Sequence, residues 1–305
     1  MSALDRVAER LGEAAQRDVA LGPLTTYRVG GPAAVFVEVE TEATLRLLAD
    51  ALAAEDEPVE TVVVGKGSNL LVADAGFPGV ALRLGGAFAD VRVDGVDVLA
   101  GGAAALPVLA RQTAAAGLTG LEWAVGVPGS VGGGVRMNAG GHGSDMAATL
   151  TEVRLLDLHS GEDGSVPAAA LELGYRHSSV RPHQVVCAAR FHLEAGDAEV
   201  ATAEIAEIVR WRRDNQPGGA NAGSVFTNPE GDSAGRLIDA AGGRGLRHGS
   251  AEVSTKHANF IQADPGGRAD DVLALMRDVQ ELVRADSGVE LIPETRLVGF
   301  AEAAP

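Results

Sequence analysis

The sequence predicts an α+β fold built from successive regions, and three observations support this prediction. Apolar residues recur at helical spacing near both ends of the chain and alternate in strand-like runs between them. Clusters of Gly, Pro and Asn separate these runs, as they do between the elements of compact domains. A chain of 305 residues is also long for one hydrophobic core, so two or three domains are expected.

The first region, residues 1–83, has the pattern of a small α/β domain. Thr41 is a typical helix N-cap, and the turn Gly30-Gly31-Pro32 precedes an alternating run. The predicted elements are a helix over 3–16, a strand over 33–39, a helix over 41–54 and a strand over 61–64.

The second region, residues 84–200, contains more strand than helix. The run VRVDGVDVLA predicts a hairpin with Asp94-Gly95 at its turn. The other predicted elements are a helix over 104–116 and strands over 151–158 and 185–193.

The third region, residues 201–287, is mainly helical. Gly288 follows the last apolar stripe and predicts the end of the longest helix. The tail, residues 288–305, is expected to return as a strand to the second region. The predicted helices cover 198–213, a short segment around Leu237 and Ile238, and 269–285.

Composition excludes several classes of function. The formal net charge of −17 argues against nucleic acid as a partner, because phosphate binding needs a basic face. No run of about 20 apolar residues predicts a membrane span, and the acidic N-terminus does not resemble a signal peptide. Cys187 is the single cysteine, so no internal disulfide is expected, which suits a reducing compartment. We therefore expect a cytoplasmic protein that acts on small molecules.

Residues 117–143 form a dense glycine-rich stretch. Glycine lacks a Cβ atom, so such a backbone can approach a ligand closely. Several N–H groups can then point at one anion, and Ser130 and Asn138 add a hydroxyl and an amide. A flexible linker is the alternative, but Trp123 and its apolar neighbours are untypical of a solvated tether.

The common nucleotide-binding and metal-binding motifs are absent. The run GKGSNLLV begins like a dinucleotide fingerprint but has Leu70 at the third glycine position. No P-loop is present, and the seven histidines lack metal-ligand spacing, so no metal site is expected. Two glycine-rich loops in different regions suggest a dinucleotide held outside a Rossmann fold.

Three polar clusters lie outside these loops: GYRHS around Arg176, GSVFTNP around Ser224 and PETR around Glu294. Arginine can hold a carboxylate through two hydrogen bonds, serine can donate a proton, and glutamate can polarise or protonate. On composition alone, each residue is more typical of a turn or a surface than of a catalytic site.

Seven motifs, taken together and in order, resemble one family. The motifs are TTYRVGGPA, GKGSNLLVADAGFPG, GLTGLEWAVGVPGSVGGGVRMNAG, GYRHS, GSVFTNP, KHANF and PETRLVG. The chain is similar to the UDP-N-acetylenolpyruvoylglucosamine reductases from about residue 24 to residue 300. The resemblance implies an FAD-binding fold of the vanillyl-alcohol-oxidase/PCMH type. Its two FAD-binding subdomains would be residues 1–83 and 84–200, and a smaller α/β substrate-binding domain would be residues 201–287.

The resemblance also implies non-covalent FAD, because residues 65–72 contain neither His nor Cys for a covalent link. The cofactor-binding residues that it implies are Tyr27, Arg28, Val29, Gly65, Lys66, Gly67, Ser68, Asn69, Leu70, Gly126, Pro128, Gly129, Ser130, Gly132, Gly133, Asn138 and Gly140.

The activity implied is NADPH-dependent reduction of the enolpyruvyl ether of UDP-N-acetylglucosamine. In that reaction Arg176 and Glu294 would stabilise an enolate-like state, and Ser224 would deliver a proton to C2. A cation and an acid aimed at developing charge are typically a large catalytic effect. The substrate-binding residues implied are Tyr175, Asn228, Lys256 and His257, although Lys256 or His257 could instead only order its loop.

The chain departs from the family pattern at two positions. Asn215 stands where many members of the family have lysine or histidine, and Thr227 stands where lysine is common. Arg212, Arg213 or Arg244 could supply the missing positive charge. Few residues separate the GYRHS motif from the next predicted strand, which leaves little room for an inserted loop. We therefore expect the chain to belong to the shorter subgroup of the family, which lacks a tyrosine lid. We also expect a monomer or a weak oligomer.

Two alternative functions remain: another PCMH-type flavin oxidoreductase acting on a small alcohol or sugar, and a flavin-binding protein without catalysis.

Overall fold

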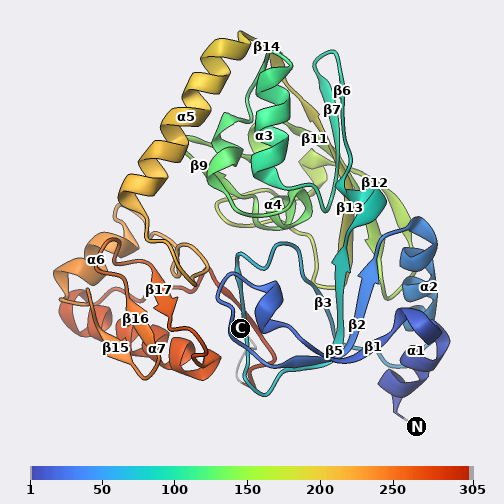
Figure 1. Ribbon diagram of the computed structural model, residues 1–305, viewed down its shortest axis with the longest axis horizontal. Coiled ribbons are helices and arrows are strands. Elements are labelled where there is room, and N and C mark those ends of the chain that lie inside the picture. Colours follow the sequence, from blue (N-terminus) through green and yellow to red (C-terminus); the bar gives the residue numbers. More distant parts are fainter. Residues whose placement is uncertain (1, 302–305) are drawn as a thin grey trace. The chain divides into compact units, whose positions relative to one another are not determined.

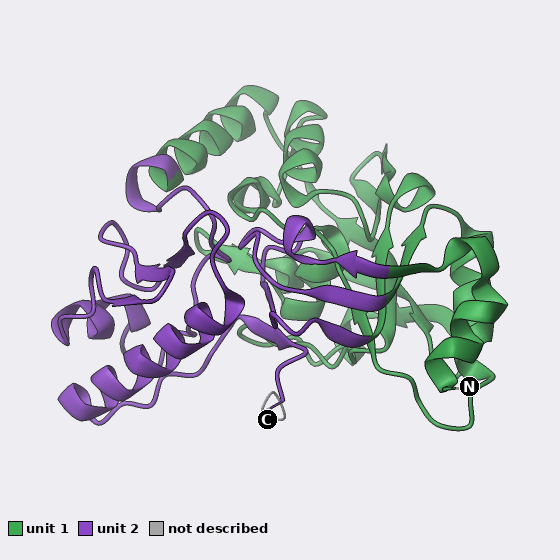
Figure 2. Cartoon of the chain, turned by 60° about the horizontal axis from the view of Figure 1, so that its bottom comes forward, with its two compact units in different colours: residues 1–17, 35–66, 79–212 green, residues 18–34, 67–78, 213–305 purple. Residues whose placement is uncertain are grey.

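The computed structural model describes residues 2–301, and the chain divides into two compact units. Unit 1 comprises residues 1–17, 35–66 and 79–212, and unit 2 comprises residues 18–34, 67–78 and 213–305. Figure 2 shows the two units in different colours. The units therefore interleave in sequence, whereas the expected division at residues 83 and 200 follows the chain in order and stays a prediction.

Helices and strands both occur in each unit (Figure 1). The α-helices are α1 (Ala3–Leu11), α2 (Glu42–Ala53), α3 (Leu106–Ala115), α4 (Val131–Met137), α5 (Ala198–Asn215), α6 (Ala234–Ala240) and α7 (Ala269–Ser287). The strands are β1 (Gln16–Ala20), β2 (Pro32–Val39), β3 (Thr61–Val63), β4 (Leu70–Val72), β5 (Phe77–Leu84), β6 (Val91–Asp94), β7 (Asp97–Gly101), β8 (Leu118–Thr119), β9 (Gly140–Gly141), β10 (Ser144–Asp145), β11 (Leu150–Asp157), β12 (Asp163–Pro167), β13 (Gln184–His192), β14 (Glu194–Ala195), β15 (Arg247–His248), β16 (Ala251–Val253), β17 (Ile261–Ala263) and β18 (Arg296–Val298).

Local signals fix several of these boundaries as predicted. The Thr41 hydroxyl accepts a hydrogen bond from the Thr44 N–H at 3.1 Å and caps α2. Gly288 ends α7 in the left-handed conformation, with φ of 74°. Asp94 pairs with Asp97 across the β6–β7 hairpin, and Gly95 supplies the positive φ of its turn.

Unit 1 contains a five-stranded antiparallel sheet of order β12-β11-β13-β7-β6 and most of a second sheet of order β1-β2-β5-β3. One core packs the second sheet and the helices α1 and α2 against Leu156, Val185 and Cys187. The Cys187 side chain is buried, and burial raises the pKa of its thiol to about 12, as expected for a packing residue. A separate core joins α3, α4 and α5 to the five-stranded sheet.

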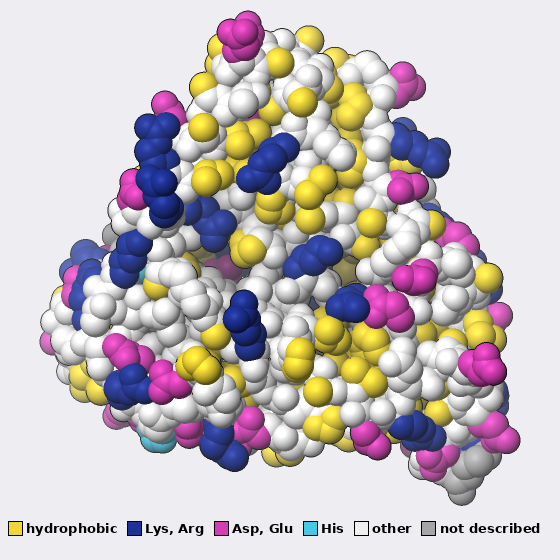
Figure 3. Space-filling view, viewed as in Figure 1, with side chains coloured by type: hydrophobic (Ala, Val, Ile, Leu, Met, Phe, Trp, Pro, Cys, Tyr) yellow, Lys and Arg dark blue, Asp and Glu magenta, His cyan; other side chains and the backbone are white. Residues whose placement is uncertain are grey.

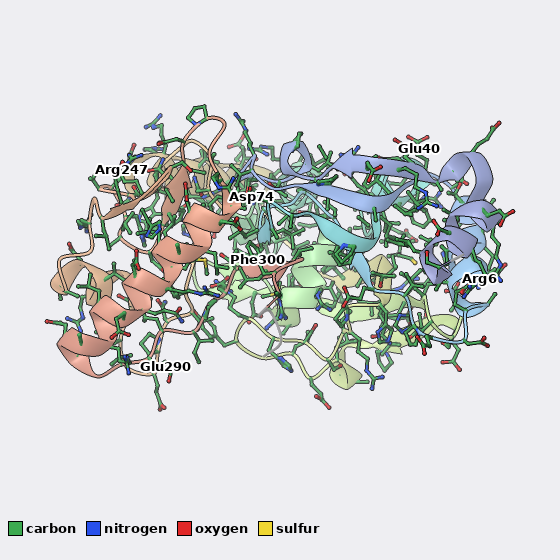
Figure 4. All side chains as sticks on the ribbon, turned by 90° about the horizontal axis from the view of Figure 1, so that it is seen from below. Arg6, Glu40, Asp74, Arg247, Glu290 and Phe300 are labelled. Atoms are coloured by element: carbon green, nitrogen blue, oxygen red, sulfur yellow. The ribbon has the colours of Figure 1, made fainter. Side chains whose placement is uncertain are left out.

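Unit 2 packs α6 and α7 with the three-stranded sheet β15-β16-β17. Its core also contains Tyr27 and Leu71, which come from far earlier in the sequence. Figure 4 labels Asp74, whose carboxylate accepts the N–H groups of Ala269 and Asp270 at 3.0 and 3.1 Å. The first turn of α7 is thereby anchored to the 67–78 segment.

The tail does not return to residues 84–200 as expected. In β18, Arg296 to Val298 pair in parallel with Leu70 to Val72 of β4, which lies in the first predicted region. The pairing brings Leu297 and Phe300 onto the core of unit 2, and this burial gives the tail its position.

The glycine-rich stretch is not one continuous loop. Its centre forms α4, with the buried Ser130 as N-cap and Asn138 as a left-handed C-cap with φ of 39°. Gly disfavours a helix by roughly 1 kcal/mol per residue relative to Ala, so tertiary packing must stabilise this one. No helix within residues 2–301 is long and apolar enough to span a membrane.

Candidate active site

The first glycine-rich segment, residues 65–72, and the second, residues 117–143, meet at Gly65 and Ser130. Both residues lie in unit 1. A Cβ atom built on Gly65 would lie 2.6 Å from the Ser130 hydroxyl oxygen, closer than real Cβ contacts allow. The Ser130 side chain is buried. Because Gly65 has no Cβ, the start of the first segment can lie directly against the start of α4.

Most N–H groups at the start of α4 already have partners inside the protein. Val131 donates to Ala104 O and Gly132 donates to Gly102 O, both at 2.8 Å. Gly133 donates to the Ser130 hydroxyl at 3.4 Å. These amides are thus used by the fold. If Gly132 and Gly133 contact a cofactor, the small size of glycine is what brings the backbone near it, rather than a set of donated N–H groups.

Asn138 holds the turn that carries Arg176. The Asn138 amide donates to Gly174 O at 2.9 Å and accepts from the Ala147 N–H at 3.0 Å. Gly174 and His177 bond each other through both backbone groups, at 3.0 and 3.1 Å, and close the two-residue turn. Asn138 is 2% exposed, so within the fold it acts as a positioning residue.

The Arg176 guanidinium is held in a defined place. Its Nη2 donates to Gly140 O at 3.0 Å, and its Cζ lies 5.1 Å from the centroid of the Tyr175 ring. Arg176 also has a φ of 54°, a left-handed conformation that is unfavourable for residues other than glycine. Such strain persists where the surrounding contacts enforce it, as Asn138 and Gly140 do here.

In unit 2 the first glycine-rich segment packs on the TTYRVGG motif. A Cβ on Gly67 would lie 2.2 Å from Leu24 O, and Gly67 has a φ of 61°. The Thr26 N–H donates to Gly67 O at 3.1 Å. Arg28 follows with a φ of 58°, so this turn is also unusual in its backbone conformation.

Tyr27 and Val29 are buried in the core of unit 2. The Tyr27 hydroxyl has no hydrogen-bond partner among the described residues, and burial raises its pKa. Both side chains support the fold of the segment, so a contact with a cofactor would come through the backbone around them.

Backbone pairing brings Ser224 and Glu294 to one place in unit 2. Phe226 and Pro293 form an antiparallel bridge, and the Glu294 N–H donates to Val225 O at 2.7 Å. The Asn69 amide donates to Glu294 O at 3.2 Å, which adds the first glycine-rich segment to the same junction. Three motifs far apart in sequence thus converge within one unit.

Asn259 is a positioning residue of the Ser224 segment that sequence reasoning missed. Its side chain accepts from the Phe226 N–H at 3.0 Å and donates to Phe226 O at 2.8 Å. Asn259 is 3% exposed and lies in the KHANF motif. The amide in that motif was the available signal, but the sequence does not show which backbone it bonds.

The predicted substrate residues of unit 2 also have structural contacts. The His257 Nδ1 accepts from the Asn259 N–H at 3.3 Å, and burial lowers the pKa of His257, so the ring is neutral and orders its loop. The Lys256 Nζ donates to Arg213 O at 2.5 Å. The Asn228 side chain accepts from the Ala234 N–H at 3.1 Å, at the start of α6.

The predicted residues are divided between the two units. Unit 1 contains Gly65, Lys66, Gly126, Pro128, Gly129, Ser130, Gly132, Gly133, Asn138, Gly140, Tyr175 and Arg176. Unit 2 contains Tyr27, Arg28, Val29, Gly67, Ser68, Asn69, Leu70, Ser224, Asn228, Lys256, His257 and Glu294. The structure therefore brings Ser224 and Glu294 together within one unit, and Arg176 with Asn138 and Gly140 within the other.

The close approach of Gly65 to Ser130 is a tight contact within the protein that leaves no room for a Cβ on Gly65. Neither residue is a typical metal ligand. Among residues 2–301 no group of three or more His, Cys, Asp or Glu side chains is arranged to hold a metal ion.

Comparison with known proteins identifies the relatives of the chain. Residues 215–298 match the family described as UDP-N-acetylenolpyruvoylglucosamine reductase, C-terminal domain, and residues 33–163 match the FAD binding domain family. A UDP-N-acetylenolpyruvoylglucosamine reductase of Acidiphilium cryptum is 45% identical over 98% of this chain and 94% of its own length. That of Rubrobacter xylanophilus is 41% identical over 97% and 99%. The crystal structure of the enzyme from Thermus caldophilus has a TM-score of 0.81 at 39% identity, over 93% of this chain and 98% of that one.

Proposed function

The chain belongs to the UDP-N-acetylenolpyruvoylglucosamine reductase family, and from this we propose that Arg176, Ser224 and Glu294 are its catalytic residues. The protein is a flavin-dependent oxidoreductase of peptidoglycan synthesis. It reduces UDP-N-acetylglucosamine enolpyruvate to UDP-N-acetylmuramate with NADPH as the electron donor. FAD, when bound, supplies the chemistry that relays a hydride from NADPH to the enolpyruvyl group.

Ser224 is the proposed proton donor to C2 of the substrate. A serine hydroxyl is a weak acid, but it can protonate a strongly basic carbanion directly. The adjacent residues support a fixed position for it, because the Val225 N–H donates to Asn259 O at 2.9 Å and Phe226 is held by the Asn259 side chain. A serine on a backbone tied at two successive residues can keep its hydroxyl aimed at one atom.

Arg176 and Glu294 are the proposed stabilisers of the charge that develops on the substrate carboxylate. The Arg176 guanidinium already donates to Gly140 O through Nη2, and its planar fork suits a carboxylate. Glu294 is fixed through its backbone by Val225 and Asn69. Preorganised groups of this kind lower the barrier because they need no rearrangement when charge develops.

The remaining assignments are proposals that follow from composition and family. Substrate contacts are assigned to Tyr175, Asn228, Lys256 and His257. The three-part division at residues 83 and 200, a monomeric or weakly associating state and a cytoplasmic location complete the proposal. The net charge of −17 supports the absence of a nucleic-acid partner.

The single observation that carries the proposal is the hydrogen bond from the Glu294 N–H to Val225 O, which joins the acid to the segment of the serine. The test is an anaerobic titration of the flavin spectrum. NADPH is expected to bleach the flavin, and the enolpyruvyl sugar nucleotide is then expected to restore its absorbance. Bleaching without recovery would contradict the proposed substrate and favour a different flavin oxidoreductase.

A further inference from the structure

The last turns of α5 pack against the second glycine-rich segment in unit 1. A Cβ built on Gly126 would lie 3.3 Å from Ile208 Cγ2 and 3.5 Å from both Arg212 Cδ and His142 Cδ2. Three side chains from two elements therefore converge on Gly126, within or close to van der Waals contact of a Cβ placed there. This contact fixes where the C-terminal part of α5 lies on the unit.

Trp211 presents an oriented aromatic face at this place. Its side chain is 48% exposed, whereas Trp123, the other tryptophan, is 3% exposed. The Trp211 ring meets the His142 ring edge to face, with centroids 5.2 Å apart and planes at 89°. His142 sits in the β9–β10 turn with a φ of 52°, so the indole is oriented by a residue with a constrained backbone.

Positive charge lies next to the His142 ring that contacts the indole. Arg212 follows Trp211 directly in sequence, and burial lowers the pKa of its guanidinium without removing its charge, because arginine stays protonated in proteins. Partial burial and the charge of Arg212 lower the pKa of His142, so this ring is neutral at pH 7. Figure 3 shows further Lys and Arg side chains along the edge over which Figure 1 draws α5.

We propose that Trp211, oriented by His142 and flanked by Arg212, is a subsite for the base of a nucleoside diphosphate. An exposed aromatic ring beside an arginine is the combination that stacks a nucleobase and attracts its phosphates. The inference rests on the proposed function, in which both substrates, the UDP-sugar and NADPH, contain this group. It deepens that function by naming the element that receives the base.

The test uses the FAD-loaded full-length protein and calorimetric titration with UDP and, separately, with NADP⁺. Trp211→Leu is expected to raise the Kd of at least one nucleotide by about 5- to 150-fold, the effect of losing one base–aromatic stack. Trp211→Phe keeps a ring and is expected to stay within threefold of the unaltered protein. Val209→Ala, at an exposed position of the same helix, is the matched control and should also stay within threefold.

The two nucleotides separate the two possible sources of the base. A rise for UDP alone assigns the subsite to the UDP-sugar, and a rise for NADP⁺ alone assigns it to NADPH. Changes below threefold for both nucleotides, or an equal loss in Trp211→Phe, would overturn the proposal. If Trp211→Leu does not fold, His142→Ala is measured in its place with the same threshold.

The outcome is distinguishable from a failure of the proposed function. Nucleotide binding is measured without turnover, so a Trp211 effect would stand even if the enolpyruvyl substrate were not reduced. Conversely, normal turnover with unchanged Kd values in Trp211→Leu would remove the subsite and leave the function intact.

Discussion

Gly65 and Ser130 lie so close that a single methyl group on Gly65 would collide with the Ser130 hydroxyl oxygen at 2.6 Å. Ser130 is also the N-cap of α4. One contact therefore links the first glycine-rich segment to the helix inside the second, and it makes the geometry of both segments sensitive to one small substitution.

Gly65→Ala is expected to weaken FAD binding and to destabilise the apoprotein. The added methyl group displaces the Ser130 side chain and removes a helix cap worth about 1 kcal/mol. Flavin fluorescence measures the Kd of FAD, and thermal unfolding measures the stability. Gly164→Ala is the control, because a Cβ there meets no atom within 4 Å. Equal behaviour of the two variants would contradict the proposed role of this contact.

Ser224→Ala is expected to leave flavin reduction by NADPH intact and to block product formation. The alanine keeps the backbone that is held by Asn259 but cannot donate a proton. Stopped-flow absorbance separates the two half-reactions. Loss of flavin reduction in this variant would exclude the proton-donor role.

Glu294→Gln is expected to slow only the second half-reaction, by roughly 10²- to 10³-fold, the usual effect of removing one stabilising group from a developing charge. The Glu294 backbone bonds to Val225 and Asn69 do not depend on the side chain, so the fold should persist. Loss of FAD from the purified variant would instead assign Glu294 a structural role.

Thr295→Val is expected to stabilise the protein by about 1 kcal/mol. Thr295 is 3% exposed, and its hydroxyl oxygen has no hydrogen-bond partner within residues 2–301. An unsatisfied buried hydroxyl lowers stability by about 1–3 kcal/mol, and valine has nearly the same shape. Urea unfolding measures the difference. Thr151→Val is the matched control, since that exposed hydroxyl donates to Arg190 O at 3.0 Å and its loss should be neutral or slightly destabilising.

The unfolding free energy is expected to fall as the pH drops from 7.5 to 5.5. Burial lowers the pKa values of His183 and His257 below 6.5, the value of an unperturbed histidine. Below pH 6.5 the unfolded chain therefore binds protons that the folded protein does not, so stability is present above this pH and lost below it. Urea unfolding across the range checks the sign, and His257→Gln should reduce the dependence. A rise in stability toward pH 5.5 would contradict the assignment.

Elements with strong local signals were predictable from sequence. The cap at Thr41, the Asp94-Gly95 turn and the helix end at Gly288 depend on neighbouring residues alone. The helix α4 was missed because three consecutive glycines disfavour it locally. Gly132 shows why it forms, since its N–H donates to Gly102 O at 2.8 Å, a contact made only in the folded chain.

Contacts between residues far apart in the chain were the other feature that the sequence could not predict. The tail was expected to return to residues 84–200, but Arg296 pairs with Leu70, a choice set by burial in a core that no local pattern reveals. The residue types of the candidate site followed from the motifs. The partners that hold them, above all Asn259 for Phe226 and Asn138 for the turn of Arg176, required the three-dimensional structure.

The interleaved composition of unit 2 has a consequence for biosynthesis. Residues 18–34 and 67–78 leave the ribosome well before residues 213–305, whose side chains complete the same core. Because translation adds roughly 5–20 residues per second, the packing partners of Tyr27 and Leu71 are synthesised on the order of ten seconds after these two residues. A nascent chain that stalls in this interval exposes apolar surface, so this protein is expected to depend on chaperones during translation more than a protein whose domains follow one another along the chain.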